Sequence, residues 1–224
     1  MNQEKKTMGV IALVCLVVTV IWLALFVATT ATEGAIESRE QALASVASLG
    51  SLHYVTYINA ALITVSATML FAGLAVVCWS EDALWSAMAS AFVPVYGLLN
   101  LFAYVSQITI VPRLVALRPG VDPMLAQMVQ AWPASMVNVL NNLGYAVLGI
   151  PSIIFGILLP RRDGALRATG ALLTASGVAS WVGIIGIASA SDVLSFGSIL
   201  SGVLFLGALV GMSFVWLRAG RETG

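Results

Sequence analysis

The chain has 224 residues, of which 60% are hydrophobic and only 9% are charged. Soluble domains carry about 25% charged residues, and disordered chains combine low hydrophobicity with high net charge, so both classes are excluded. Ten basic residues balance ten acidic ones, which excludes a strongly basic surface and a nucleic-acid partner. The composition therefore predicts an all-α integral membrane protein, surrounded by membrane lipids.

Long stretches without charge divide the chain into membrane spans. Residues 7–32 carry no charge, and a helix needs about 20 apolar residues to cross the hydrocarbon core. We read this stretch as a span, with a cleaved leader as the lesser alternative, because no small-residue cleavage site follows it closely. The sequence predicts one domain over residues 1–224 with six transmembrane helices, at about 8–31, 53–79, 83–111, 133–159, 168–190 and 193–217.

Basic residues in the loops predict the orientation, because short loops rich in Lys and Arg stay on the cytoplasmic side. With the N-terminus inside, the inner segments carry Lys5, Lys6, Arg161, Arg162, Arg167, Arg218 and Arg221, and the outer loops carry Arg39, Arg113 and Arg118. We therefore expect both termini to be cytoplasmic, in a multi-pass protein of the cytoplasmic (inner) membrane.

Two outer connections are long enough to hold structure of their own. Residues 32–52 are rich in Ala and Ser, which favours a helical extension at the surface. In the second connection, Asp122 and Pro123 resemble an N-cap followed by a helix-starting proline. We predict a short helix over Met124–Trp132 that lies flat on the membrane surface or caps the bundle.

Polar side chains repeat at spacings of three and four residues along the second, third and fourth predicted spans. Such spacing places them on one helical face, and polar groups are costly in lipid unless they meet each other. Once the direction of each helix is considered, many of them share the outer half of the membrane. We predict that they form an uncharged cluster that opens outward, with Tyr57, Asn100, Tyr104, Gln107, Asn138, Asn142 and Tyr145 as its ligand-binding residues.

This polar cluster has two interpretations. Its side chains can hydrogen-bond across helices and hold the bundle together, each contributing about 0.6 and at most about 2 kcal/mol. They can also line a pocket that binds or permeates a small neutral or weakly polar molecule, which is our leading hypothesis. A pocket predicts open volume beside Asn100 and Asn142, whereas a purely structural role predicts that these two amides bond to each other without a cavity.

Two alternative functions remain open. The protein could be a non-catalytic accessory or scaffold subunit, in which Gly207 and Gly211 form a GxxxG face for a homo-oligomer or membrane partner. It could also be a small membrane enzyme of the terpene-cyclase kind, which needs an acid to deliver a proton. The candidate acids are Glu81, Asp82, Asp122 and Asp192, and no spacing favours any of them.

Cysteine and histidine are too few for most cofactor chemistry. The chain has one histidine, His53, and two cysteines, Cys15 and Cys78, that form no CxxC motif. Metal and haem sites usually need several converging His or Cys ligands. We expect no metal and no cofactor, buried single thiols, and an interfacial role for His53 rather than proton transfer.

The run Leu143–Arg161, LGYAVLGIPSIIFGILLPR, carries a family resemblance. Together with the chain length and the six spans, it is similar to six-helix bacterial membrane proteins that are grouped as a domain of unknown function. The resemblance covers the whole chain in hydropathy and loop placement, and the second half matches better. It implies a bacterial inner-membrane protein and implies no activity.

Overall fold

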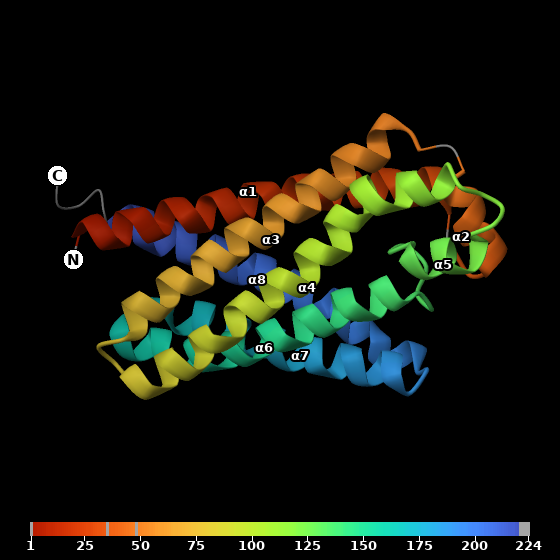
Figure 1. Cartoon of the computed structure of the whole chain (residues 1–224). Coiled ribbons are helices and arrows are strands. Elements are labelled where there is room, and N and C mark those ends of the chain that lie inside the picture. The colour runs from red at the N-terminus through yellow and green to blue at the C-terminus, as the bar shows by residue number, and fades with distance from the viewer. Residues whose placement is uncertain (1, 35, 48, 220–224) are drawn as a thin grey trace.

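The protein is a bundle of long helices. The computed structural model describes residues 2–34, 36–47 and 49–219, and these ranges contain helices and no strand (Figure 1). Six of the described helices are long and apolar enough to cross a membrane, which confirms the predicted all-α architecture with six spans. They are α1 (Asn2–Glu33), α3 (Ser51–Cys78), α4 (Ala83–Val115), α6 (Met136–Arg162), α7 (Arg167–Ala188) and α8 (Asp192–Ala219).

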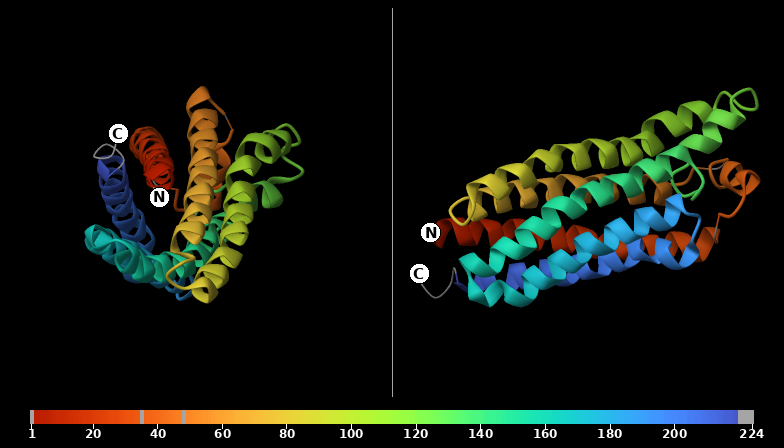
Figure 2. Two further views of the ribbon diagram at one scale, coloured as in Figure 1. Left: turned by 90° about the vertical axis from the view of Figure 1, so that its left-hand side faces the viewer. Right: turned by 90° about the horizontal axis from the view of Figure 1, so that it is seen from below.

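The long helices follow one another around the bundle. Each packs against its neighbour in the chain, and α8 returns to pack against α1 (Figure 2). A Cβ atom on Gly9 would lie 3.0 Å from the side chain of Leu217, so the start of α1 and the end of α8 share one end of the bundle. We call this the inner end, after the predicted orientation, and the opposite one the outer end. Arg221, one of the predicted inner cations, lies outside the described residues.

Helices α3 and α6 meet across the ring of helices. Besides their contacts with α4, α3 and α6 touch each other directly. The three helices α3, α4 and α6 therefore form a compact group within the bundle, and the predicted polar cluster lies on these three helices.

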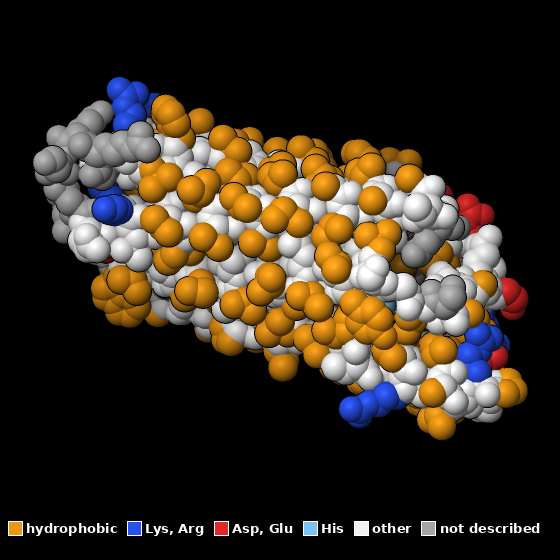
Figure 3. Space-filling model, turned by 90° about the horizontal axis from the view of Figure 1, so that it is seen from above, with side chains coloured by type: hydrophobic (Ala, Val, Ile, Leu, Met, Phe, Trp, Pro, Cys, Tyr) orange, Lys and Arg blue, Asp and Glu red, His pale blue; other side chains and the backbone are white. Residues whose placement is uncertain are grey.

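The surface matches a membrane environment. On the face that Figure 3 shows, hydrophobic side chains cover the middle of the bundle and charged side chains lie near its two ends. Large apolar side chains such as Val76, Leu98 and Phe214 are more than half exposed on this surface. In a bilayer they face acyl chains, which removes the cost that the same surface would carry in water.

Buried apolar side chains form two clusters. The larger one fills the inner half with residues from all six long helices, and Phe71, Phe155 and Trp216 are among its fully buried members. The smaller one lies at the outer end, beneath two short helices, α2 (Arg39–Ser45) and α5 (Asp122–Met128). The middle of the outer half, between these clusters, contains the predicted polar side chains.

Glycines let α6, α7 and α8 pack at backbone distance. A Cβ atom on Gly177 would lie 2.5 Å from the carbonyl oxygen of Gly149 on α6, and one on Gly197 would lie 2.6 Å from the amide nitrogen of Gly183 on α7. The predicted GxxxG face takes part in this packing. A Cβ atom on Gly207 would lie 3.3 Å from Leu172, and one on Gly211 would collide with Thr169. This face of α8 therefore packs against α7 of the same chain.

Several helix boundaries differ from the predicted ones: α1 begins at Asn2 rather than near residue 8, α4 ends at Val115 rather than near residue 111, and the fourth span begins later than predicted. We predicted Pro133 in the first turn of this helix, but α6 begins at Met136. The hydroxyl of Ser135 accepts a hydrogen bond from the backbone N–H of Asn138 and so caps a helix that begins three residues after Pro133. The first outer connection does contain a helix, α2, which begins with a capping box between Ser38 and Gln41.

Candidate functional site

The outer half of α3, α4 and α6 brings together part of the predicted cluster. The hydroxyl oxygens of Tyr104 and Tyr145 lie 2.7 Å apart and share a hydrogen bond between α4 and α6. The ring of Tyr57, on α3, lies 6.5 Å from the ring of Tyr104. Tyr104 is buried, whereas Tyr57 and Tyr145 are partly exposed. The three phenols therefore connect all three helices at the same depth.

Three of the predicted residues hold the chain segment that follows α5. The side-chain amide of Gln107 donates to the carbonyl of Met128 at 2.8 Å and accepts from the backbone N–H of Gln130 at 3.1 Å. The side chain of Asn138 donates to the backbone carbonyl of Gln130 at 2.9 Å, and the hydroxyl of Tyr57 donates to the side-chain oxygen of Gln130 at 3.2 Å. Helices α3, α4 and α6 thus each fix the segment 128–130 from below.

Helices α2 and α5 form a cap over the outer end. Leu125 and Val129 are buried in the outer apolar cluster, and Arg118 links the two short helices. Its guanidinium group donates to the carbonyl of Leu43 at 3.2 Å and pairs with Asp122 at 2.9 Å. The predicted Met124–Trp132 helix is shorter than expected and covers the bundle, which is the second of its two predicted positions. The polar cluster beneath it is therefore covered from outside.

Asn142 does not meet Asn100. Its amide nitrogen donates to the carbonyl and the side-chain oxygen of Asn138, each at 3.0 Å, one turn earlier on the same helix. A purely structural role predicted a hydrogen bond between Asn100 of α4 and Asn142 of α6. The described residues do not contain this bond. Asn138 and Asn142 instead support each other and the cap.

Asn100 is the exception in this cluster. Its side chain is 0% exposed, and neither its amide nitrogen nor its amide oxygen has a hydrogen-bond partner in the described part of the chain. The amide lies against Gly144 of α6, where a Cβ atom would be 2.6 Å from the amide nitrogen. Only glycine at position 144 leaves room for it. Asn141, three residues earlier on α6, also has a buried side-chain oxygen without a partner.

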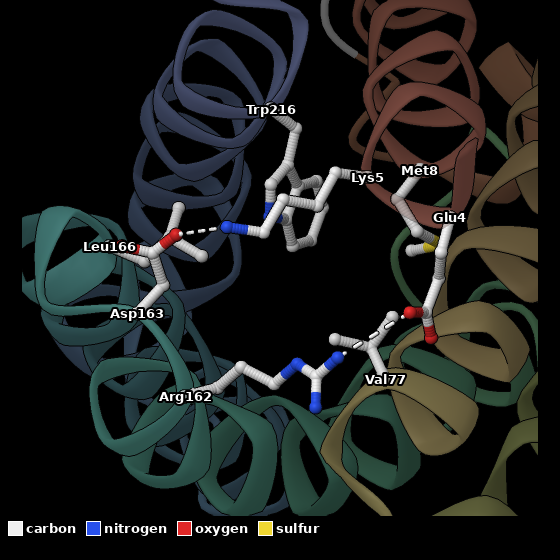
Figure 4. A pocket seen from close by; sticks show the side chains of 8 residues that line it. All are labelled: Glu4, Lys5, Met8, Val77, Arg162, Asp163, Leu166 and Trp216. Atoms are coloured by element: carbon white, nitrogen blue, oxygen red, sulfur yellow. Dashed lines mark hydrogen bonds and ion pairs between the residues drawn. The ribbon is translucent and has the colours of Figure 1, made fainter. Parts of the chain in front are cut away.

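Two cavities of the described residues are lined by neither Asn100 nor Asn142. One is a groove between α3 and α4, and the other is a small pocket at the inner end (Figure 4). The predicted open volume beside Asn100 and Asn142 is therefore not among them. The polar cluster combines a bonded part that holds the cap with one closed, unbonded amide.

Ion pairs surround the inner pocket. Figure 4 shows Lys5 of α1 pointing at Asp163, 3.0 Å away, and Arg162 directed at Glu4, 3.4 Å away. The hydrogen bond from Lys5 lowers the pKa of Asp163 below its usual value. The volume of about 10 Å³ is the size of one water molecule. These pairs connect α1 to the turn after α6 and leave no room for a larger ligand.

The acids considered for a cyclase lie at the two ends of the bundle. Glu81 is 4.0 Å from Arg162, Asp82 caps α4 by accepting from the backbone N–H of Trp85, and Asp122 pairs with Arg118. Asp192 begins α8 and is exposed. All four acids therefore lie at the ends of the bundle and not in its interior.

The remaining reactive side chains have ordinary surroundings. Cys15 and Cys78 are buried free thiols, as predicted. His53 has its Nε2 atom 3.0 Å from the carbonyl oxygen of Gln107 and packs against the ring of Tyr57. Among the described residues, His, Cys, Asp and Glu form no group of three that could hold a metal ion.

Two important residues were not among the predicted ones. Gln130 lies in a loop, so helical spacing could not indicate that it connects Tyr57, Gln107 and Asn138. Gly144 could have been found, because it follows Asn141 by three residues and lies on the same side of α6. The face that contains it packs on Asn100.

Comparison with models of protein families, with curated proteins and with solved structures finds no match. The family resemblance of Leu143–Arg161 therefore stays a prediction, and the six long apolar helices are the part of it that the structure bears out.

Proposed function

We propose that the protein binds a small neutral or weakly polar molecule between α3, α4 and α6, in the outer half of the membrane. In this proposal both termini are cytoplasmic and the membrane is the cytoplasmic membrane of a bacterium. The observation that carries the proposal is the side chain of Asn100, fully buried with a donor and an acceptor that no described residue satisfies.

The energetics of Asn100 favour a bound polar molecule. A buried polar group without a partner costs about 1–3 kcal/mol, and Asn100 contributes two such atoms. A leucine of similar size would avoid this cost if the position served packing alone. A ligand that hydrogen-bonds to the Asn100 amide removes this cost. Asn100 therefore lowers the stability of the ligand-free protein and strengthens the binding of a ligand.

The surroundings favour a neutral ligand. The predicted binding residues are amides and phenols, and a bare charge is far more costly to bury than a hydrogen-bonding neutral group. The bonded hydroxyls of Tyr104, one turn after Asn100 on α4, and of Tyr145, the residue after Gly144 on α6, offer further hydrogen-bonding atoms. In this proposal the cap controls entry from outside, because a molecule can reach Asn100 only after the hydrogen bonds of residues 128–130 open.

The test is native mass spectrometry of the protein extracted in mild detergent. We expect a small neutral molecule to copurify with the wild-type chain and to be lost in Asn100→Leu. The control is Asn59→Leu, the same change at a buried asparagine of α3 that also has an unpartnered oxygen. Equal retention of the molecule by Asn100→Leu and Asn59→Leu would contradict the proposal, as would its absence from the wild type at saturating concentrations of neutral solutes.

A second candidate is the accessory or scaffold subunit, and the bonds of the cap favour it. Gln107 and Asn138 connect helices to the cap rather than to a ligand, as a structural role requires. A partner would use a surface other than the Gly207 and Gly211 face, which α7 covers. The two candidates differ at Asn142. If Asn142→Leu abolishes ligand binding with a modest loss of stability, the ligand proposal holds, and if it mainly unfolds or dissociates the protein, the scaffold proposal holds.

A further inference from the structure

A groove on the outside of the bundle lies between α3 and α4. It is lined by Val65, Thr68 and Met69 of α3 and by Pro94, Gly97, Leu98 and Leu101 of α4, and its volume is about 380 Å³. Its floor is the place where the helices touch, since a Cβ atom on Gly97 would lie 3.2 Å from the hydroxyl of Thr68. Leu98 is 71% exposed and Met69 is 55% exposed, so the groove is open along its rim.

The groove lies deep in the membrane. Pro94 follows the start of α4 at Ala83 by eleven residues, which is about 17 Å along a helix and near the middle of a hydrocarbon core of about 30 Å. No charged residue occurs between Glu40 and Glu81 on the α3 side or between Asp82 and Arg113 on the α4 side. At this depth the molecules next to the protein are the acyl chains of lipids.

The lining offers no polar recognition. The hydroxyl of Thr68 is the single side-chain polar group in the lining, and it donates to the carbonyl of Thr64 at 2.7 Å, within its own helix. A polar ligand would find no free side-chain donor there. An apolar chain needs none.

The size of the groove suits an occupant of small-molecule width. Its volume falls within the roughly 300–1,000 Å³ of small-molecule sites.

We infer that the groove between α3 and α4 binds one acyl chain of a membrane phospholipid as a lasting site, rather than by the passing contact of bulk lipid. The flexible side chains of Met69 and Leu98 close over the chain from opposite walls, and Gly97 keeps the floor deep. Asn100 is not part of the groove lining, since its amide lies against Gly144 of α6.

The test fills the groove. Val65→Trp places a large ring in the groove from the α3 wall, and Val76→Trp is the control, an exposed valine on the same helix outside the lining. Each protein is reconstituted with palmitoyl-oleoyl phosphatidylglycerol, extracted in mild detergent and examined by native mass spectrometry. We expect the wild type and Val76→Trp to retain one phospholipid under collisional activation, and Val65→Trp to lose it.

A second variant guards against misfolding. If the thermal midpoint of Val65→Trp is lower than that of the wild type, Leu98→Trp is used instead. It fills the groove from the α4 wall and is expected to lose the phospholipid in the same way. Equal retention of phospholipid by the filled variants and Val76→Trp overturns the inference, as does complete loss from the wild type. A dimer of the wild type that Val65→Trp dissociates also overturns it, because the occupant would then be a second copy.

Discussion

A single methyl group on Gly156 tests the close packing of α6 on α7. In Gly156→Ala the new Cβ atom would collide with the hydroxyl of Thr174, and it would lie 2.6 Å from the carbonyl oxygen of Gly170 and 2.8 Å from the backbone nitrogen of Thr174. Two of these neighbours are backbone atoms of α7, which cannot rotate away. The helices must separate, and overpacking of this kind costs about 1–3 kcal/mol.

The matched control is Gly202→Ala on α8. Gly202 is exposed within its helix, and a Cβ atom there would meet nothing within 4 Å. Alanine is favoured over glycine in a helix by about 1 kcal/mol, and this gain applies to both variants. The difference between Gly156→Ala and Gly202→Ala therefore isolates the packing cost.

The assay is thermal unfolding of both variants in the same mild detergent. For a chain of this size, 1 kcal/mol corresponds to about 2–4 °C, so the midpoint of Gly156→Ala should lie roughly 2–12 °C below that of Gly202→Ala. Equal midpoints would refute the reasoning, because they would mean that α6 and α7 do not meet at backbone distance.

Three further predictions concern the site, the cap and the inner end. Gly144→Ala should weaken ligand binding with less loss of stability than Gly156→Ala, because the methyl meets only the movable amide of Asn100, as calorimetry and thermal unfolding can show. Gln107→Leu leaves the carbonyl of Met128 and the N–H of Gln130 unpaired, at about 1–3 kcal/mol each, so hydrogen exchange over residues 122–132 should accelerate while that of α7 stays unchanged. Because the pKa of Asp163 is lowered in the folded protein, its pair with Lys5 stabilises above the unfolded value of about 3.9 and is lost as pH falls through the folded value. The free energy of unfolding of the wild type should therefore exceed that of Asp163→Asn at pH 7 by at most about 1 kcal/mol, which corresponds to a thermal midpoint higher by at most about 4 °C. This excess should vanish at acid pH, and a difference independent of pH would contradict the pairing.

The spans could be predicted because their signal is long. A run of apolar residues such as 7–32 must be longer than the hydrocarbon core is thick, and no local competition can remove that signal. Helix ends depend on single side chains instead. Pro133 and Ser135 both suit the start of α6, and the sequence alone does not decide that the hydroxyl of Ser135 prevails.

Helical spacing predicted which side chains face the interior better than it predicted their hydrogen-bond partners. Helical spacing placed Tyr104, Asn100 and Gln107 on the buried face of α4, where the structure has them. The partner of Gln107 is the backbone after α5, which has no periodicity and lies more than twenty residues away in the chain. The rotation of α6 that presents Gly144 to Asn100 depends on packing between helices, which spacing within one helix does not determine.

The central claim, that Asn100 is kept for a ligand, is tested most directly by the stability of Asn100→Leu in ligand-free detergent. The substitution removes two buried unpaired atoms at nearly constant volume, so the account predicts a thermal midpoint equal to or above that of the wild type, together with loss of the copurifying molecule. A midpoint well below the wild type, with no change in bound mass, would contradict the account and make Asn100 a structural residue.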